Sequence, residues 1–272
     1  MTELDTIKRC IDGPVTVESL CADLRALGVE SGMTLLVHSS LSALGWVCGG
    51  AQAVVLALQE VLGAQGTLAM PTHSGDFSDP APWQHPPVPE NWWETIRQTM
   101  PAYDAAMTPT RKMGRIVECF RSQRDVLRSA HPHVSFAASG PLAEQITADH
   151  GLEFSLGEHS PLARLYELDA WVLLLGVGHG NNTSLHLAET RAKHAGRKTT
   201  QAQAPIMKDG RRQWVMFTDV DYDDEDFTRI GEAFEAQADQ LRVAKTGYGK
   251  GRLFRQRPLV DYAVKWIEEN RS

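Results

Sequence analysis

The sequence lacks the features that mark several classes of protein. Its four cysteines are widely spaced and include no Cys-x-x-Cys pair, which argues against a disulfide framework or a thiolate metal site. No apolar run reaches the roughly 18 residues that a membrane-spanning helix needs. The first residues, MTELDTIKRC, contain no signal-peptide core. We therefore expect a cytoplasmic protein that does not enter a membrane.

Several catalytic and binding motifs are also missing. The sequence has no Gly-x-Ser-x-Gly elbow, no P-loop and no His-Glu-x-x-His motif. The segment GVGHGNN lacks the third glycine of a dinucleotide-binding fingerprint. A net charge of −7 disfavours nucleic acid as a partner. Ten histidines are present, but their spacing offers no set of ligands, so we expect no catalytic metal.

The first third of the chain alternates between helical and strand patterns. TVESLCADLRALG predicts a helix that Thr16 caps and Gly28 ends. MTLLVH, at 33–38, and GTLAM, at 66–70, predict buried strands, and residues 51–63 predict a second helix between them. Such alternation indicates layers of helices and strands.

Later segments extend this pattern. A helix is expected from Met113, short strands at VLRS and HVSFAAS, and a helix over 160–169 with Ser160 as its cap. WVLLLGV predicts a strand buried on both faces. KTTQAQAPIM and QWVMFTDV flank an Asp-Gly turn and predict a hairpin, and helical patterns close the chain. We predict one domain over 1–272, with a central mixed sheet, flanking helices and an antiparallel C-terminal part.

The segment from about 71 to 110 differs in composition from its surroundings. It is rich in proline and holds three of the seven tryptophans. Proline breaks helices and removes a backbone donor from sheets. Long irregular segments inside a compact domain are usually lids or binding loops. We predict a lid-like insertion, the alternative being a loop that merely lies on the surface.

The stretch NNTSLHLAET, directly after the buried strand, holds the most suggestive pair of side chains. On a helix, His186 and Glu189 would lie on one face because they are three residues apart. A carboxylate beside an imidazole orients the ring and stabilises the imidazolium, as a general base requires. The spacing alone also fits a surface histidine beside a solvated glutamate.

Five segments occur in an order that resembles the aminoglycoside 3-N-acetyltransferase family: LLVHSSLSALGWVCGGAQAVVLAL, PTHSGDFSDP, TPTRKMGRIVECFR, AHPHVSFAASG and LLLGVGHGNNTSLHLAE. The resemblance covers nearly the whole chain. It implies a mixed α/β fold distinct from that of GNAT acetyltransferases. It also implies an acyltransferase that uses acetyl-coenzyme A to acetylate the 3-amino group of the 2-deoxystreptamine ring of aminoglycosides, which confers antibiotic resistance.

The resemblance also implies roles for individual residues. His186 would be the general base, and Glu189 would either hold its imidazole or bind the acceptor amine. Coenzyme A would lie along the HSSLSALG segment, where the backbone N–H of Ser40 or Leu41 could stabilise the oxyanion. The predicted cofactor contacts are His38, Ser39, Ser40, Leu41, Ser42, Thr110, Arg115 and Ser135. In the TRKMGR segment, basic side chains would suit the 3′-phosphate, although they equally fit a solvated helix start.

A polycationic acceptor calls for acidic and polar partners. The predicted acceptor-binding residues are Asp76, Glu158, Asn182 and Glu189. The acidic run at 219–227 is either a further wall of this site or an ordinary helix start. Three other hypotheses remain: transfer to a different amine, a non-catalytic acyl-coenzyme A or aminoglycoside-binding module, and a metal-dependent hydrolase. The sequence leaves monomer and homodimer equally open.

Overall fold

The computed structural model describes residues 2–271, and within them a mixed seven-stranded sheet forms the centre of the fold. Its middle strands are parallel: β1 (Thr34–Ser39) lies between β2 (Thr67–Pro71) and β5 (Trp171–Leu175). All of β5 is buried, as its continuous apolar run predicted. Parallel strands bring the loops that follow them to one edge of the sheet, where ligands commonly bind.

Antiparallel strands complete the sheet on both sides. The strand order is β3-β4-β2-β1-β5-β9-β8, with β3 (Leu127–Arg128), β4 (Phe136–Ser139), β8 (Arg242–Thr246) and β9 (Gly249–Arg255). This arrangement confirms the predicted central mixed sheet. The pair β8–β9 was not expected, because its sequence is rich in lysine, arginine and glycine, which are not typical of strands.

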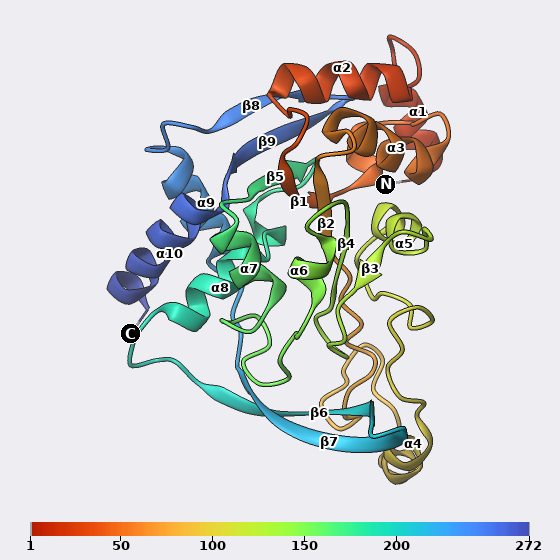
Figure 1. Cartoon of the computed structure of the whole chain (residues 1–272), viewed down its shortest axis with the longest axis vertical. Helices are drawn as coiled ribbons and strands as arrows, with labels where there is room; N and C mark the ends of the chain where they lie inside the picture. The colour runs from red at the N-terminus through yellow and green to blue at the C-terminus, as the bar shows by residue number, and fades with distance from the viewer. Residues whose placement is uncertain (1, 272) are drawn as a thin grey trace.

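Helices cover both faces of the sheet (Figure 1). The first face carries α2 (Val17–Leu27), α3 (Gly50–Leu62) and α5 (Arg115–Arg121). The second carries α6 (Ala143–Thr147), α7 (Pro161–Glu167), α8 (Ser184–Arg191), α9 (Phe227–Glu235) and α10 (Gln256–Asn270). Successive strand residues point to opposite faces, so Leu35 and Leu36 of β1 enter different hydrophobic cores. Among residues 2–271, no helix is both long and apolar enough to cross a bilayer.

Two predicted helix caps have different outcomes. The Thr16 hydroxyl accepts the N–H of Ser19, and the Ser19 hydroxyl accepts the N–H of Thr16, so α2 begins with a reciprocal capping box. Gly28 ends α2 in the left-handed region, as predicted. Ser160 does stand before α7, but its hydroxyl donates to the Gly157 carbonyl instead of capping the helix.

The predicted hairpin consists of β6 (Thr199–Lys208) and β7 (Arg211–Val220). Asp209 and Gly210 both have positive φ angles, as a two-residue hairpin turn of this kind requires. The two strands pair with each other outside the central sheet and form an arm along one end of the molecule (Figure 1). This separation from the main sheet could not be read from the strand pattern.

The 71–110 segment packs against the tip of this arm. It is largely irregular, as predicted, but it also contains the 3₁₀-helix η2 (Glu90–Trp92) and helix α4 (Trp93–Thr99). Tyr103 donates its N–H to the Pro205 carbonyl of β6, and Arg212 of β7 donates to the Met100 carbonyl. The remaining short elements are α1 (Glu3–Arg9) and the 3₁₀-helices η1 (Leu41–Leu44) and η3 (His179–Asn181).

Candidate active site

The carboxyl ends of β1 and β5 meet at one edge of the sheet and bring two polar segments together. Thr183, just before α8, donates its N–H to Nε2 of His38 at 3.0 Å, and its hydroxyl lies 2.8 Å from the same nitrogen. Because Nε2 accepts a backbone N–H, the ring proton of neutral His38 must be on Nδ1. This contact fixes the start of α8 against the end of β1.

His186 and Glu189 lie on one face of α8, as their spacing predicted. Nδ1 of His186 is 2.6 Å from Oε2 of Glu189, whose side chain is only 3% exposed. The imidazole also packs against the rings of Tyr222 and Phe227. With Nδ1 directed at the carboxylate, Nε2 is the nitrogen left to face a substrate, and no residue among 2–271 bonds to it.

The second oxygen of Glu189 is also paired. Oε1 accepts from Nη1 of Arg271 at 2.6 Å and from the backbone N–H of Asp223 at 3.0 Å. Burial disfavours the charged form of Arg271, but its hydrogen bonds to Asp226 and Glu189 outweigh this and raise its pKa, so it remains a cation. Both carboxylate oxygens therefore have protein partners, which favours an orienting role over a direct contact with the acceptor amine.

Two further histidines near His186 are held in the neutral form. Burial, followed by the nearby His186, lowers the pKa of His38 to about 3. The same two causes lower the pKa of His73 to about 3. Nδ1 of His38 and Nε2 of His73 are buried without a partner in the described part of the chain. Neither histidine adds positive charge beside His186 at neutral pH.

Asn182, a predicted acceptor-binding residue, lies inside the protein. It is 1% exposed, its Oδ1 accepts the N–H of Ser184, and its Nδ2 lies 3.4 Å from Nδ1 of His179. His179 in turn places Nε2 2.9 Å from Glu235. These contacts shape the turn that leads into α8, so the structure gives Asn182 a supporting position.

The HSSLSALG segment forms the end of β1 and the 3₁₀-helix η1, beside the site. The N–H of Ser40 donates to the Leu175 carbonyl of β5 at 3.0 Å, so it is not free to stabilise an oxyanion. The N–H of Leu41 has no acceptor within residues 2–271. Of the two predicted donors, only Leu41 remains available. Ser39 has a buried hydroxyl without a partner in the described chain, and the hydroxyls of Ser40 and Ser42 lie 3.4 Å apart.

The TRKMGR segment lies against the start of α3. Together they line a depression of about 400 Å³ formed by Ala51, Thr110, Lys112, Met113, Gly114, Arg115, Glu118 and Cys119. Thr110 uses its N–H and its hydroxyl to bind Glu118, at 2.6 and 2.9 Å. Lys112 and Arg115 are exposed and have no acidic partner in the part of the chain described. Their charges are therefore available to an anionic group.

Three other predicted contact residues already have partners in the protein. Ser135 is fully buried, donates to the Thr72 carbonyl and accepts from Arg128, which leaves it no path to a cofactor in this conformation. Asp76 pairs with Arg111 on the surface. Glu158 binds Arg191 through both oxygens, at 2.7 and 2.9 Å.

Two residues near the pair, His73 and Arg271, were not among the predicted site residues. His73 follows β2, whose parallel neighbour β1 carries His38 next to its last residue. The position of His73 just after a central strand was therefore a signal that could have selected it. Arg271 is 82 residues from Glu189, and no local pattern connects them. In residues 2–271, no group of three or more histidine, cysteine or acidic side chains is placed to hold a metal ion.

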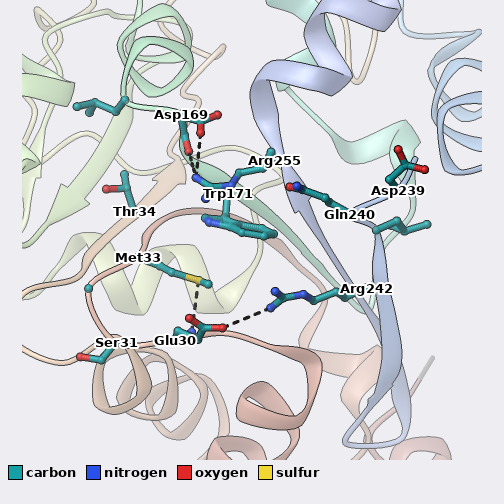
Figure 2. A pocket seen from close by; sticks show the side chains of 13 residues that line it. Glu30, Ser31, Met33, Thr34, Asp169, Trp171, Asp239, Gln240, Arg242 and Arg255 are labelled. Carbon is teal, nitrogen blue, oxygen red and sulfur yellow. Dashed lines mark hydrogen bonds and ion pairs between the residues drawn. The ribbon is translucent and has the colours of Figure 1, made fainter. Parts of the chain in front are cut away.

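A large cavity lies at the opposite edge of the sheet (Figure 2). It measures about 750 Å³ and is bordered by Thr34 at the start of β1 and Trp171 at the start of β5. Arg242 and Arg255 stack on the Trp171 ring and pair with Glu30 and Asp169, respectively. His186 does not line this cavity, so its size alone does not identify the site.

Comparison with known proteins identifies the family. The sequence model described as aminoglycoside 3-N-acetyltransferase matches residues 36–268, most of the chain. The chain belongs to the aminoglycoside 3-N-acetyltransferase family. This confirms the family predicted from the five sequence segments, together with its acyltransferase class.

Relatives of this acetyltransferase match over nearly their whole length. YokD of Bacillus subtilis strain 168, a prophage-derived aminoglycoside N(3')-acetyltransferase-like protein, is 47% identical over 95% of this chain and 94% of its own. The crystal structure of YokD matches the structure of this chain with a TM-score of 0.95, and the match covers 98% of each chain. Aminoglycoside N(3)-acetyltransferase VII of Streptomyces paromomycinus is 38% identical over 99% and 96% of the two chains.

One solved relative bears directly on the co-substrate. AAC-IIIb, solved as a binary complex with CoASH, has a TM-score of 0.83 and 30% identity, covering 94% of this chain and 97% of its own. The predicted mixed fold and the predicted coenzyme A co-substrate are thus confirmed at the level of the family.

The buried neutral histidines predict a loss of stability in mild acid. Burial lowers the pKa of His38 and His73 to about 3 and that of His150 to about 4, whereas an unfolded histidine titrates near 6.5. As the pH falls below 6.5, the unfolded chain therefore binds more protons than the folded one. Each such histidine removes on the order of 1 kcal/mol of unfolding free energy per pH unit. Urea unfolding between pH 7 and pH 4.5 measures this slope.

A matched pair of variants assigns the slope to buried histidine. His150 bonds to Ser129 and Ser155 inside the protein, whereas His85 is exposed. We expect His150→Gln to be less stable at pH 7 and to depend less steeply on pH, and His85→Gln to keep the wild-type slope. Equal slopes in all three proteins would contradict the assignment.

Proposed function

We propose that this protein transfers the acetyl group of acetyl-coenzyme A to the 3-amino group of the 2-deoxystreptamine ring of an aminoglycoside, and that this reaction confers resistance. The observation that carries the proposal is the His186–Glu189 pair on α8, with Nε2 of the imidazole left unpaired by residues 2–271. Family membership and the CoASH complex of AAC-IIIb support the same reaction. A non-catalytic binding module would have no need of such a base.

The proposed chemistry is a direct transfer. His186 accepts a proton from the acceptor amine through Nε2, which frees the nitrogen lone pair. That lone pair attacks the thioester carbonyl carbon, so that a C–N bond forms and the C–S bond then breaks. The attacking nitrogen then loses its second proton, and the thiolate of coenzyme A takes up one proton, so that the products are the amide and coenzyme A with a free thiol. Glu189, on Nδ1, keeps the ring in the Nδ1–H tautomer and stabilises the imidazolium.

Coenzyme A is proposed to extend from the HSSLSALG segment, at the carboxyl end of β1, to the TRKMGR segment beside the start of α3. The 3′-phosphate would meet Arg115 and Lys112, while Thr110 helps to shape that wall. The pantetheine and the thioester would pass the residues from Ser39 to Ser42. The N–H of Leu41 is the proposed oxyanion donor, because the Ser40 amide already binds Leu175. His38 would contribute a neutral wall near the acetyl group.

For the polycationic acceptor, we propose a wall formed by the 71–110 insertion and the β6–β7 arm. These two segments are bonded to each other and so act as one unit of the single domain over 1–272. Asp76 and Glu158 are exposed carboxylates that could exchange their arginine partners for an ammonium group. The proposal applies equally to a monomer and to a homodimer.

Removing the base should abolish most of the turnover. In His186→Ala, thiol release from acetyl-coenzyme A with an aminoglycoside should fall by on the order of 10²–10⁴. Calorimetry should still detect coenzyme A binding, because His186 is not part of the phosphate-binding wall. Lys265→Ala, at an exposed position of α10 that belongs to neither proposed binding wall, serves as the control. Near-wild-type turnover in His186→Ala would overturn the general-base role. If the wild-type protein turned over no aminoglycoside at all, the result would favour a different amine as the acceptor.

The 3′-phosphate contact can be tested separately. Arg115→Ala should raise the KM for acetyl-coenzyme A by on the order of tenfold while leaving kcat nearly unchanged, because a charge-assisted hydrogen bond is lost at a site remote from the chemistry. With 3′-dephospho-acetyl-coenzyme A, wild type and variant should behave alike. Arg124→Ala, exposed but outside the depression, is the matched control. An equal KM increase with both co-substrates would rule out a contact between Arg115 and the 3′-phosphate.

A further inference from the structure

We propose that Arg271 is a positioning residue that holds Glu189 against His186 and sets the pH range in which His186 can accept a proton. This inference rests on the proposed function, since it assigns His186 the role of general base. It concerns a residue that follows α10 and lies far along the chain from α8.

Arg271 is fixed by contacts on several sides. Nη1 donates to Oε1 of Glu189 at 2.6 Å. Nε and Nη2 donate to the two oxygens of Asp226, at 2.8 and 2.5 Å. Nη2 also donates to the Asp223 carbonyl at 2.7 Å. A planar guanidinium bound in this way has one orientation, and with the N–H of Asp223 it fixes where the Glu189 carboxylate lies.

The charges of this group are screened only weakly by solvent. The side chains of Glu189, Arg271 and Asp226 are 3%, 14% and 17% exposed. In such surroundings a carboxylate attracts the proton of a neighbouring imidazolium strongly. The positive charge of Arg271 offsets part of this attraction. Without it, Glu189 would hold the proton on His186 to higher pH, and less of the free base would exist near neutrality.

The other groups around the pair do not substitute for Arg271. His38, His73 and Tyr222 lie near the His186 ring, and Asp226 binds Arg271. The other titratable and charged side chains line the same pocket as Glu189 and Arg271: Asp221, Asp223, His194, Arg197 and Lys198. His38 and His73 are neutral, and burial raises the pKa of Tyr222 so that it stays protonated. Within residues 2–271, Arg271 is the only arginine or lysine whose side chain bonds to Glu189.

The test is the pH dependence of kcat/KM, measured for the enzyme and for three variants. Arg271→Gln should move the acid limb of the kcat/KM profile to higher pH by about one unit, which lowers activity about tenfold on that limb while the alkaline plateau is largely retained. Arg271→Lys keeps the charge and should restore most of the wild-type profile. Asp226→Asn should move the limb in the opposite direction, because it leaves the charge of Arg271 more fully to Glu189.

An NMR titration of the His186 ring in the free enzyme gives a readout that needs no turnover. Its midpoint should follow the kinetic shifts in both directions. Equal loss of activity at every pH, with an unchanged midpoint in folded Arg271→Gln, would overturn the proposal and leave a purely structural role. If His186→Ala remained active, the proposed base would fail, but the NMR midpoints would still decide whether Arg271 controls the His186–Glu189 pair.

Discussion

Glu189 places a negative charge inside the protein, and a buried carboxylate is stable only when its oxygens are fully paired. The imidazole of His186, the guanidinium of Arg271 and the N–H of Asp223 provide that pairing. Helix α8, the loop before α9 and the residue after α10 must therefore meet at one point. The packing of α8, α9 and α10 on one face of the sheet is what brings them together (Figure 1).

Two histidines near His186 carry no charge at neutral pH. The Thr183 N–H holds His38 in one tautomer, and burial keeps both His38 and His73 neutral. A protonated histidine beside His186 would repel the imidazolium that the proposed transfer forms. Neutral histidines and a fully paired carboxylate are the surroundings that the proposed proton transfer to Nε2 of His186 needs.

Local patterns in the sequence were sufficient for the elements and residues that depend on local physics. Helix α2, strand β5 and the β6–β7 turn follow from capping, burial and turn chemistry, and the His186–Glu189 contact follows from helical spacing. Long-range packing decided the rest. The basic β8–β9 hairpin gains its strand structure from pairing with β5, and Arg271 reaches Glu189 only after α10 has packed on α8.

The tautomer of His186 tests the central claim most directly. The ¹⁵N chemical shifts of its ring in the free, full-length enzyme, recorded above the pH at which it titrates, report which nitrogen carries the proton. The account predicts a single neutral tautomer with the proton on Nδ1, bonded to Glu189, and an unprotonated Nε2. A proton on Nε2, or two tautomers in comparable amounts, would contradict it, because Nε2 would then not be available as the base.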